Sequence, residues 1–458
     1  MGDRKVLASA MITSFMTTFM SSALNLSIPA LESFFDVSAA AVGWIVSAYT
    51  ISVAAFSLPM GKVADIAGRR KVFLTGIAGF GILSVLCIFV THIGALIALR
   101  ALMGVCAGMI FSTNNAILIT SYPSEVRGRV LGYSTAATYI GLTMGPVIGG
   151  FLNSTLGWRS IFAVSVLVSL IALAAAVRSG YRDSASEDVH MHFDVTGSLL
   201  YVFAIIASLQ GMSELGAARR AVPVLLAGIF ALVCFFIYES RRADPVMKVS
   251  MFSGSRTFTF SCLAALLNYG ATFAISYTVS IYLQVILGIS SAKAGLILIS
   301  MPAVQALLSP LTGSLSDRIR PGILASAGMG LCTFTLVLFS RLGSGTSLAY
   351  VICALCVTGF GFALFSSPNT NAILSCVDRE DYAVANSIIA TMRTYGQSSG
   401  MAILSVITSA FLGSRSLAGS PQGDILAMMH TAFLVFAALS VAGLLFSLAR
   451  DSRNQNPA

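Results

Sequence analysis

Two arginines lie inside segments that are otherwise long and apolar, and their charge could bind a ligand there. Arg100 stands in Leu-Arg-Ala-Leu-Met-Gly, and Arg393 stands in Thr-Met-Arg-Thr-Tyr-Gly. A charged side chain in such surroundings is costly, which makes it a candidate functional residue. None of the 18 Asp and Glu residues falls in the middle of an apolar segment. The two arginines therefore favour a neutral or anionic ligand, although either guanidinium could instead reach a polar surface.

A band of hydroxyl, amide and aromatic side chains provides further candidates. Asn268, Thr272 and Ser276 are spaced four residues apart, and Tyr269 and Phe273 run beside them. A step of four advances about 40° beyond a full helical turn, so the band winds across its helix. Such a surface suits a large, weakly polar ligand, and ordinary packing is the alternative. Polar residues in other apolar segments complete the predicted ligand site: Asn25, Asn114, Asn115, Gln305, Asn369 and Asn371.

A charged segment, residues 61–71, separates two apolar runs and reads GKVADIAGRRK. Because charge is expensive in hydrocarbon, this segment must lie at a membrane surface. Its small residues allow close helix approach, and Asp65 is expected at the N-terminus of a helix elsewhere in the chain. Residues 313–320, GSLSDRIR, repeat part of this pattern of glycine, aspartate and arginine. The residues of the two segments that stand out by type and spacing are Gly61, Asp65, Gly68, Arg69, Arg70, Asp317 and Arg318.

The composition identifies the element type that must position these residues. The chain has 458 residues, of which 56% are hydrophobic and 10% are charged. A soluble domain carries about 25% charged residues, so this is an integral membrane protein. Its apolar runs are continuous and not alternating, which favours helices over a barrel. We predict no enzyme chemistry, no cofactor and no metal. We also predict no nucleic-acid partner, since the basic residues lie in short loops between apolar runs.

Hydropathy predicts an all-α protein with about fourteen transmembrane helices. The first apolar run, Val6–Leu31, is too long for a signal-peptide core, so we expect it to remain as the first helix. With the N-terminus inside, nineteen of the 27 Lys and Arg residues fall in inner loops and tails and six in outer loops. This bias predicts a multi-pass protein of the cell membrane with both termini in the cytoplasm.

The chain contains an internal repeat. The sequence Asn-Ala-Ile-Leu at 115–118 recurs at 371–374, and a nearly equal offset of 255 pairs Gly141 with Gly396 and Gly145 with Gly400. We therefore expect two related six-helix bundles with two additional helices inserted between them. The predicted units are residues 1–180, an insert with its linker and connector at 181–256, and residues 257–458.

Three motifs resemble the major facilitator superfamily. Residues 61–71 resemble the signature loop between its second and third helices, and residues 141–150, GLTMGPVIGG, resemble the G-x-x-x-G-P-x-x-G-G motif of its exporter branches. Arg100 and Gly104 resemble the R-x-x-Q-G motif of proton-coupled exporters, with Met103 in place of glutamine. The aspartate that the fourteen-span drug/proton antiporter branch carries near the end of its first helix is Met20 here. In the second motif, close helix crossing and a kink are expected from Gly141, Gly145, Pro146, Gly149 and Gly150.

The resemblance implies an efflux transporter, similar to multidrug and tetracycline exporters, that moves small lipophilic compounds by alternating access. It also implies that residues 61–71 and 313–320 gate the transporter by holding its cytoplasmic side closed. It also implies proton antiport, with Arg100 and Glu32 as the coupling candidates. The expected partners are a small-molecule substrate, a proton and the lipid bilayer, and the expected state is a monomer. Because no acid lies mid-membrane, an exporter or uncoupled facilitator of a neutral, anionic or lipid-like metabolite is the alternative. A membrane scaffold without transport activity is a third.

Overall fold

The computed structural model describes residues 4–24, 27–37, 39–179, 181, 193–215, 220–242, 244–412 and 421–450. Throughout these ranges the regular structure is helical, without strands. The helices are α1 (Arg4–Ser22), α2 (Ile28–Phe35), α3 (Ala39–Ala67), α4 (Arg69–Ile88), α5 (Ile93–Ser121), α6 (Arg127–Leu156), α7 (Arg159–Arg178), α8 (Val195–Ser213), α9 (Ala221–Glu239), α10 (Ser250–Gly254), α11 (Arg256–Ile281), α12 (Ser291–Leu298), α13 (Ser300–Ser316), α14 (Pro321–Phe339), α15 (Leu348–Leu374), α16 (Tyr382–Leu412) and α17 (Gln422–Ala449).

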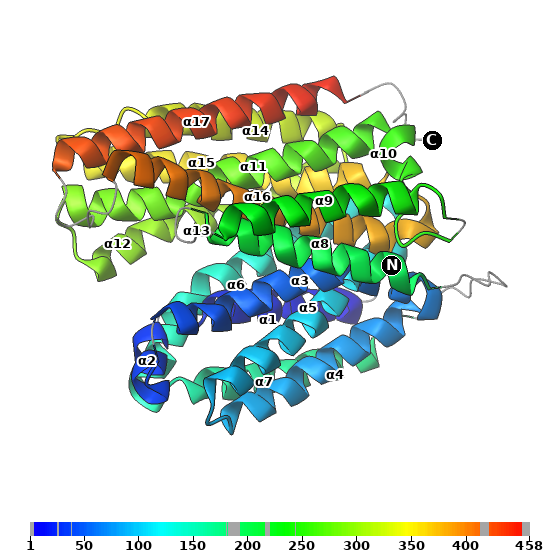
Figure 1. Cartoon of the computed structure of the whole chain (residues 1–458). Helices are drawn as coiled ribbons and strands as arrows, with labels where there is room; N and C mark the ends of the chain where they lie inside the picture. Colours follow the sequence, from blue (N-terminus) through cyan, green and yellow to red (C-terminus); the bar gives the residue numbers. More distant parts are fainter. Residues whose placement is uncertain are drawn as a thin grey trace.

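Twelve segments in the described ranges are long and apolar enough to cross a membrane. Two further long helices, α1 and α16, are more polar and are not among the twelve. The all-helical membrane fold is thus established, whereas the count of fourteen spans stays a prediction. The start of α1 and the end of α17 lie at the same end of the bundle (Figure 1). Residues 61–71 and 313–320 lie at this end too, which we call the basic end.

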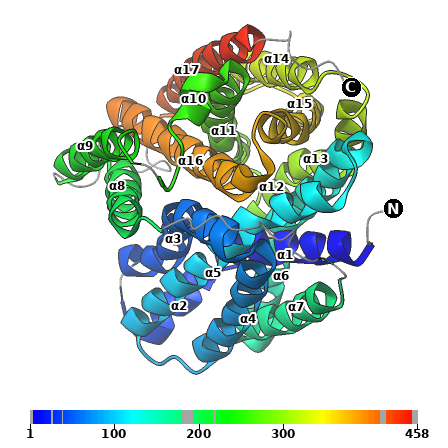
Figure 2. The ribbon, with the colours of Figure 1, turned by 90° about the vertical axis from the view of Figure 1, so that its right-hand side faces the viewer.

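The long helices form two groups that face each other (Figure 2). In the first group, α3 packs on α5, α4 on α5 and α7, and α1 on α6 and α7. In the second, α11 packs on α16 and α17, α14 on α15 and α17, and α13 on α15. The groups meet along two seams, where α3 packs on α16 and α6 on α13. A space left between the seams would be lined by helices of both groups.

Helices α8 and α9 pack against each other and lie outside the two groups (Figures 1 and 2). Helix α8 contacts α3 and α16, so the pair sits against one of the two seams. The hydroxyls of Tyr201 and Thr391 are hydrogen bonded at 2.8 Å, and Ser208 bonds to the hydroxyl of Tyr395. Both partners on α16 flank Arg393, so this pair of helices supports the segment that carries the arginine.

Glycines let α6 lie directly on α1. A Cβ atom at Gly145 would overlap the side chain of Ser22, and one at Gly149 would overlap the carbonyl of Ala23. The second group repeats this arrangement, because a Cβ at Gly400 would overlap the carbonyl of Gly270 on α11. Helix α6 continues through Pro146 without interruption. Close packing at these two crossings fixes the positions of the polar side chains on α1, α6, α11 and α16.

The prediction of one helix over the apolar run 6–31 is wrong. Helix α1 ends at Ser22, and a separate short helix, α2, begins at Ile28. Pro29 stands in the first turn of α2, where its missing N–H is tolerated, whereas inside a continuous helix it would break a backbone hydrogen bond. The break moves Glu32 onto α2, at the end of the bundle opposite the basic end (Figure 1).

Candidate functional site

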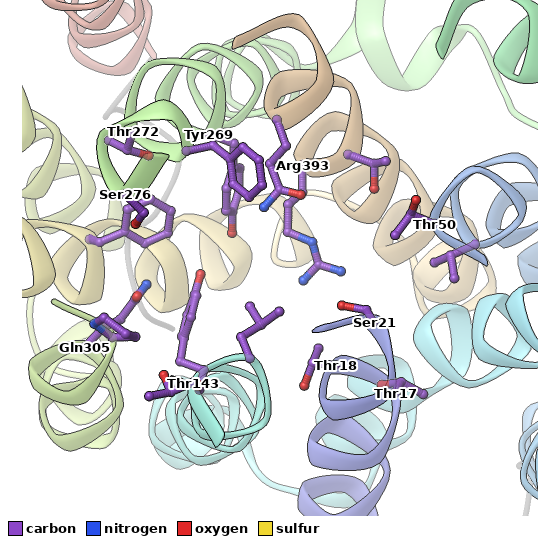
Figure 3. A pocket seen from close by; sticks show the side chains of 18 of the residues that line it. Thr17, Thr18, Ser21, Thr50, Thr143, Tyr269, Thr272, Ser276, Gln305 and Arg393 are labelled. Carbon is purple, nitrogen blue, oxygen red and sulfur yellow. Dashed lines mark hydrogen bonds between the residues drawn. The ribbon is translucent and has the colours of Figure 1, made fainter. Parts of the chain in front are cut away.

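A cavity of about 530 Å³ lies between the two groups of helices. The first group contributes mainly hydroxyl side chains to its wall, which are Thr17, Thr18, Ser21, Thr50 and Thr143 (Figure 3). The lining residues come from the middle of the helices and from the parts that run away from the basic end. The volume is within the range of sites that bind drug-sized molecules.

Aromatic rings cover the side of the cavity formed where the two groups meet. The rings of Tyr139 and Tyr269 each meet the ring of Phe362 edge to face, with centroids 5.8 and 5.2 Å apart. Phe273 and Tyr277 on α11 also line the cavity, and nearly half of each side chain is exposed. Edge-to-face clusters of this kind offer ring faces and ring edges to an aromatic ligand.

Arg393 supplies the charge of the cavity. Its side chain projects from α16 into the open space (Figure 3). The guanidinium carbon lies 4.9 Å from the centre of the Phe111 ring, a cation–π arrangement. Among the described residues that line the cavity, the other side chains are uncharged. The site therefore has a positive potential that no carboxylate of the lining offsets.

Gln305 supplies an unused hydrogen-bonding group at the other side of the cavity (Figure 3). The side chain is 1% exposed, and its Nε2 has no hydrogen-bond partner among the described residues. Thr272 and Ser276 line the same region, and the Thr272 hydroxyl donates to the carbonyl of Asn268 at 2.6 Å. A buried amide without a partner is costly, so a bound molecule that completes its hydrogen bonds would be stabilised.

A polar layer separates the cavity from the basic end. It surrounds a small second cavity of about 60 Å³ that shares Phe111, Tyr139, Tyr269 and Arg393 with the first. Asn115 donates to Oδ1 of Asn386 at 2.9 Å, and Asn386 donates to the carbonyl of Phe111. Asn114 donates to the Ser14 hydroxyl at 2.8 Å. Since Asn386 belongs to α16 and Asn115 to α5, this layer joins the two groups.

The seam between α3 and α16 is closed at the basic end by Asp65. Its Oδ2 accepts a hydrogen bond from the backbone N–H of Val384, 3.3 Å away in the first turn of α16. Arg69 donates to Oδ1 of Asp65 at 2.8 Å and to the carbonyl of Glu380 at 3.2 Å. Gly68 has a φ of 103°, which glycine adopts without strain, and this turn lets α4 start beside Asp65.

The seam between α6 and α13 is closed in the same way by Asp317. Its two carboxylate oxygens accept hydrogen bonds from the backbone N–H groups of Gly128 and Arg129, at 2.6 and 3.0 Å. Burial raises the pKa of the Asp317 carboxyl, while the two backbone N–H groups act in the opposite direction. Gly128 and Gly313 allow the backbones to touch, since a Cβ atom on either would overlap the other's carbonyl. Each acidic segment thus caps a helix of the opposite group.

Comparison with known proteins decides the family. The model of the Major Facilitator Superfamily matches residues 10–253 and 261–458. The chain belongs to the Major Facilitator Superfamily. Its relatives and its fold are those of transporters, so the chain is a membrane transporter and not an enzyme.

Several facilitators resemble the chain over most of its length. It is 29% identical to the riboflavin transporter RibZ of Clostridioides difficile, with 87% of each chain covered. It is 27% identical to the multidrug resistance protein Stp of Mycobacterium tuberculosis, over 85% of this chain and 73% of the relative. The crystal structure of the human organic anion transporter MFSD10 (TETRAN) has the same fold, with a TM-score of 0.68 at 15% identity over 97% of this chain and 99% of that one.

The facilitator cavity contains only some of the predicted ligand residues. Arg393, Tyr269, Thr272, Phe273, Ser276 and Gln305 line the main cavity, and Asn114 and Asn115 line the smaller one. Asn25 lies outside the described residues. Asn268 is fully buried on α11 and does not line either cavity, because it points into the packing between helices.

Arg100, predicted as a ligand residue, does not line either cavity. Its side chain is fully buried away from both cavities. The Nε donates to the carbonyl of Ile45 at 3.0 Å, Nη2 donates to the carbonyl of Met20 at 3.2 Å, and the guanidinium lies over the Tyr49 ring. These contacts tie α5 to α3 and to the end of α1. Arg100 therefore holds helices together.

Two predicted asparagines and one acid are also not at the cavity. Asn369 accepts from Arg450 at 3.0 Å and donates to the carbonyl of Ser261, because it faces α11 and α17 within the second group. Asn371 donates to the hydroxyl of Ser316 on α13. Glu32 lies on α2 beyond the break after α1 and does not line either cavity, so it cannot exchange a proton there directly.

The charged residues at the basic end differ in role. Arg70 donates to the carbonyl of Val177 at 3.2 Å, because α7 ends beside it. Arg318 is exposed at the end of α13. Gly61 lies against Ala383 and Ser387 at the first seam, and the Ser387 hydroxyl donates to the carbonyl of Ser57 at 2.8 Å.

Sequence reasoning missed several residues of the cavity and its polar layer, including Tyr139, Phe362, Phe111 and Asn386. The repeat offers a signal for one of them. The offset of 255 that pairs Gly141 with Gly396 also pairs Tyr139 with Thr394, the neighbour of Arg393. Both Tyr139 and Thr394 line the main cavity. Phe362 and Phe111 carry no comparable signal, since they stand in apolar segments among many similar residues.

Proposed function

We propose that the chain exports small, largely apolar organic molecules from the cytoplasm by alternating access. The observation that carries this proposal is a cavity of about 530 Å³ between two helix groups whose seams are sealed at the basic end by reciprocal acid-to-helix contacts. The printed names of the relatives, a riboflavin transporter and a multidrug resistance protein, support an organic substrate. The glycine packing of α6 on α1 supports the exporter branch of the family.

The proposed architecture has fourteen spans. Helices α1 and α16 would be the two that are too polar to be recognised by composition, because their polar faces line the cavity and its polar layer. The units would be residues 1–180, 181–256 and 257–458, and the protein would act as a monomer. The basic end would face the cytoplasm of the cell membrane with both chain termini, so this conformation would be open to the outside.

The proposed transport cycle opens and closes the seams. Opening to the cytoplasm requires that Asp65 and Asp317 leave the first turns of α16 and α6, and that Asn115 and Asn386 separate. The close glycine contacts at both seams would allow the helices to slide past each other as rigid bodies. The contacts of α6 with α1 and of α16 with α11 lie within one group each and would persist.

Proton antiport belongs to the proposal, and uncoupled transport is the second candidate. Within the described residues no carboxylate lines either cavity, and Arg100 and Glu32 both lie away from them. This observation favours the uncoupled candidate or a proton carried by the substrate itself. Purified protein in liposomes would distinguish them. Accumulation of a fluorescent substrate that rises when a pH gradient is imposed supports antiport, and equal accumulation with and without the gradient rules it out.

The export function is tested with a panel of antibiotics and dyes. Cells that lack their own efflux pumps should accumulate less of at least one compound when they produce the chain. A variant with Asp65→Ala and Asp317→Ala should lose most of this difference, because both seals at the basic end are removed. Equal accumulation for every compound, with the protein shown to be in the membrane, would contradict the proposal.

A further inference from the structure

The cavity combines one cation without an ion-pair partner, an aromatic wall and a separate amide, and each of these restricts the ligand. From this combination, and resting on the proposed export function, we propose that the transported molecule is a planar aromatic organic anion. Its acidic group would pair with Arg393, its ring would lie against Tyr139, Tyr269 and Phe362, and a neutral polar group would reach Gln305. The proposed export of small organic molecules does not by itself require that the substrate is negatively charged.

The first argument is the charge of Arg393. The four ion pairs found among the described residues, Asp65–Arg69, Glu214–Arg220, Asp194–Arg242 and Asp381–Lys248, do not include it. Its guanidinium contacts the Phe111 ring and faces open space. A guanidinium presents parallel N–H donors that match a carboxylate, sulfonate or phosphate, and such charge-assisted bonds are the strong ones. The unpaired cation therefore favours an anionic ligand.

The second argument is the repulsion of cations. A lipophilic cation in this cavity would approach Arg393 without a nearby carboxylate to offset the repulsion, since the described lining is otherwise uncharged. In a site with apolar walls such a like-charge contact is screened less than in water. The same lining therefore discriminates against cationic drugs while accepting anionic ones.

The third argument concerns shape. The ring cluster of Tyr139, Phe362 and Tyr269 forms part of the wall, and the rings brace one another at 5.8 and 5.2 Å. Arg393 and Gln305 project from different helices into the same space (Figure 3). The buried Gln305 amide, whose Nε2 has no described partner, gains most from a hydrogen-bond acceptor on the ligand. A ring system with an acidic group and a second, neutral polar group satisfies all three features.

The test compares two dyes with the same xanthene ring system and opposite charge. Fluorescein is an anion at pH 8, and rhodamine 123 is a cation. Binding to the purified full-length protein in lipid nanodiscs is followed by fluorescence anisotropy. We expect the protein to bind fluorescein at least about tenfold more tightly than rhodamine 123, the ratio expected from charge-assisted hydrogen bonds. A preference for rhodamine 123, or equal affinities, would overturn the proposal.

Variants show which residue causes the preference for fluorescein over rhodamine 123. Arg393→Gln should weaken fluorescein binding about tenfold and leave rhodamine 123 binding unchanged or stronger, whereas Arg393→Lys should keep the preference for the anion. Arg341→Gln, which changes an exposed arginine between α14 and α15, is the matched control and should behave like the unmodified protein. Gln305→Leu should weaken both dyes and leave their ratio unchanged. A ratio that is insensitive to Arg393→Gln would overturn the assignment.

The outcome for the anion site is separable from the outcome for export. Fluorescein binding that depends on Arg393, without export of any compound from cells or liposomes, would contradict the export function and support the anion site. Export of neutral and cationic drugs at rates that Arg393→Gln leaves unchanged would support export and overturn the anion site. If Arg393→Gln does not yield a folded protein, Arg393→Lys and the dye preference of the unmodified chain still decide the question.

Discussion

Asn115 donates a hydrogen bond across 2.9 Å to Oδ1 of Asn386, and the two residues belong to opposite groups of helices. The bond lies in the polar layer between the main cavity and the basic end. Asn386 also donates to the carbonyl of Phe111, whose ring lies under the Arg393 guanidinium. The contact that closes the cavity on one side is therefore next to the residue that gives the cavity its charge.

A chemical crosslink across this pair should stop transport. In a background without the native cysteines, Asn115→Cys and Asn386→Cys should react with a short bifunctional thiosulfonate, because their side chains face each other in this conformation. Dye export should fall to the background level and recover when a reductant removes the link. Either single cysteine variant is the control. Full export by the crosslinked protein would show that the two groups do not separate here.

A methyl group at Gly149 should destabilise the protein. In Gly149→Ala the new Cβ would overlap the backbone carbonyl of Ala23, and a backbone atom cannot move aside cheaply. We expect a loss of about 1–3 kcal/mol, the usual cost of overpacking, measured as a lower midpoint of thermal unfolding in detergent. Gly330→Ala on α14 is the control, because a Cβ there meets no atom within 4 Å. Equal midpoints for the two variants would refute the packing role.

Substitution of Arg100 should change stability and not selectivity. Arg100→Met removes the hydrogen bonds to the carbonyls of Ile45 and Met20 and leaves both acceptors buried. We expect a loss of about 3 kcal/mol, which is typical for two bonds to a buried charged group. The ratio of fluorescein to rhodamine 123 binding should stay unchanged, in contrast to Arg393→Gln. A changed ratio with normal stability would return Arg100 to the ligand site.

The contact between α8 and α16 should affect the ligand site indirectly. Tyr201→Phe removes the 2.8 Å hydrogen bond to Thr391, two residues before Arg393. We expect a loss of about 0.5–1.5 kcal/mol in unfolding free energy and weaker fluorescein binding, because α16 is less firmly held. Tyr133→Phe, which removes a hydroxyl that bonds to no described residue, is the control. If Tyr201→Phe and Tyr133→Phe bind the dye equally well, α8 does not position α16.

The sequence was sufficient for the all-helical membrane fold, because membrane insertion depends on few variables. Some local patterns have a single structural interpretation. They are the long apolar runs, the repeat at Asn115 and Asn371, and glycines such as Gly145 and Gly400. The position of Asp65 beside a helix N-terminus could also be predicted from a local pattern, since a charge at the end of an apolar run must be neutralised. The break after Ser22 was missed because composition does not show where a helix stops inside an apolar run.

The candidate site was only partly predictable, since a polar residue within a helix can face a cavity or a neighbouring helix. Arg100 and Arg393 look equivalent in sequence, yet Arg100 donates to backbone carbonyls while Arg393 faces open space. Asn115 and Asn371 occupy repeated positions, but Asn115 lies in the polar layer and Asn371 bonds to Ser316. The aromatic wall was missed at Tyr139 and Phe362, because its partners come from α6, α11 and α15, far apart in the chain.

The position of Arg393 on α16 has an electrical consequence. A bound monoanion cancels the guanidinium charge, so the loaded transporter would cross the membrane voltage without doing work, whereas the empty transporter would carry one positive charge back. With the cell interior negative, each 100 mV would favour the inward return by up to about 2.3 kcal/mol. Voltage alone would then drive net outward movement of the anion. Export of a monoanionic dye from liposomes that is unaffected by a potassium diffusion potential would show that the cycle carries no net charge.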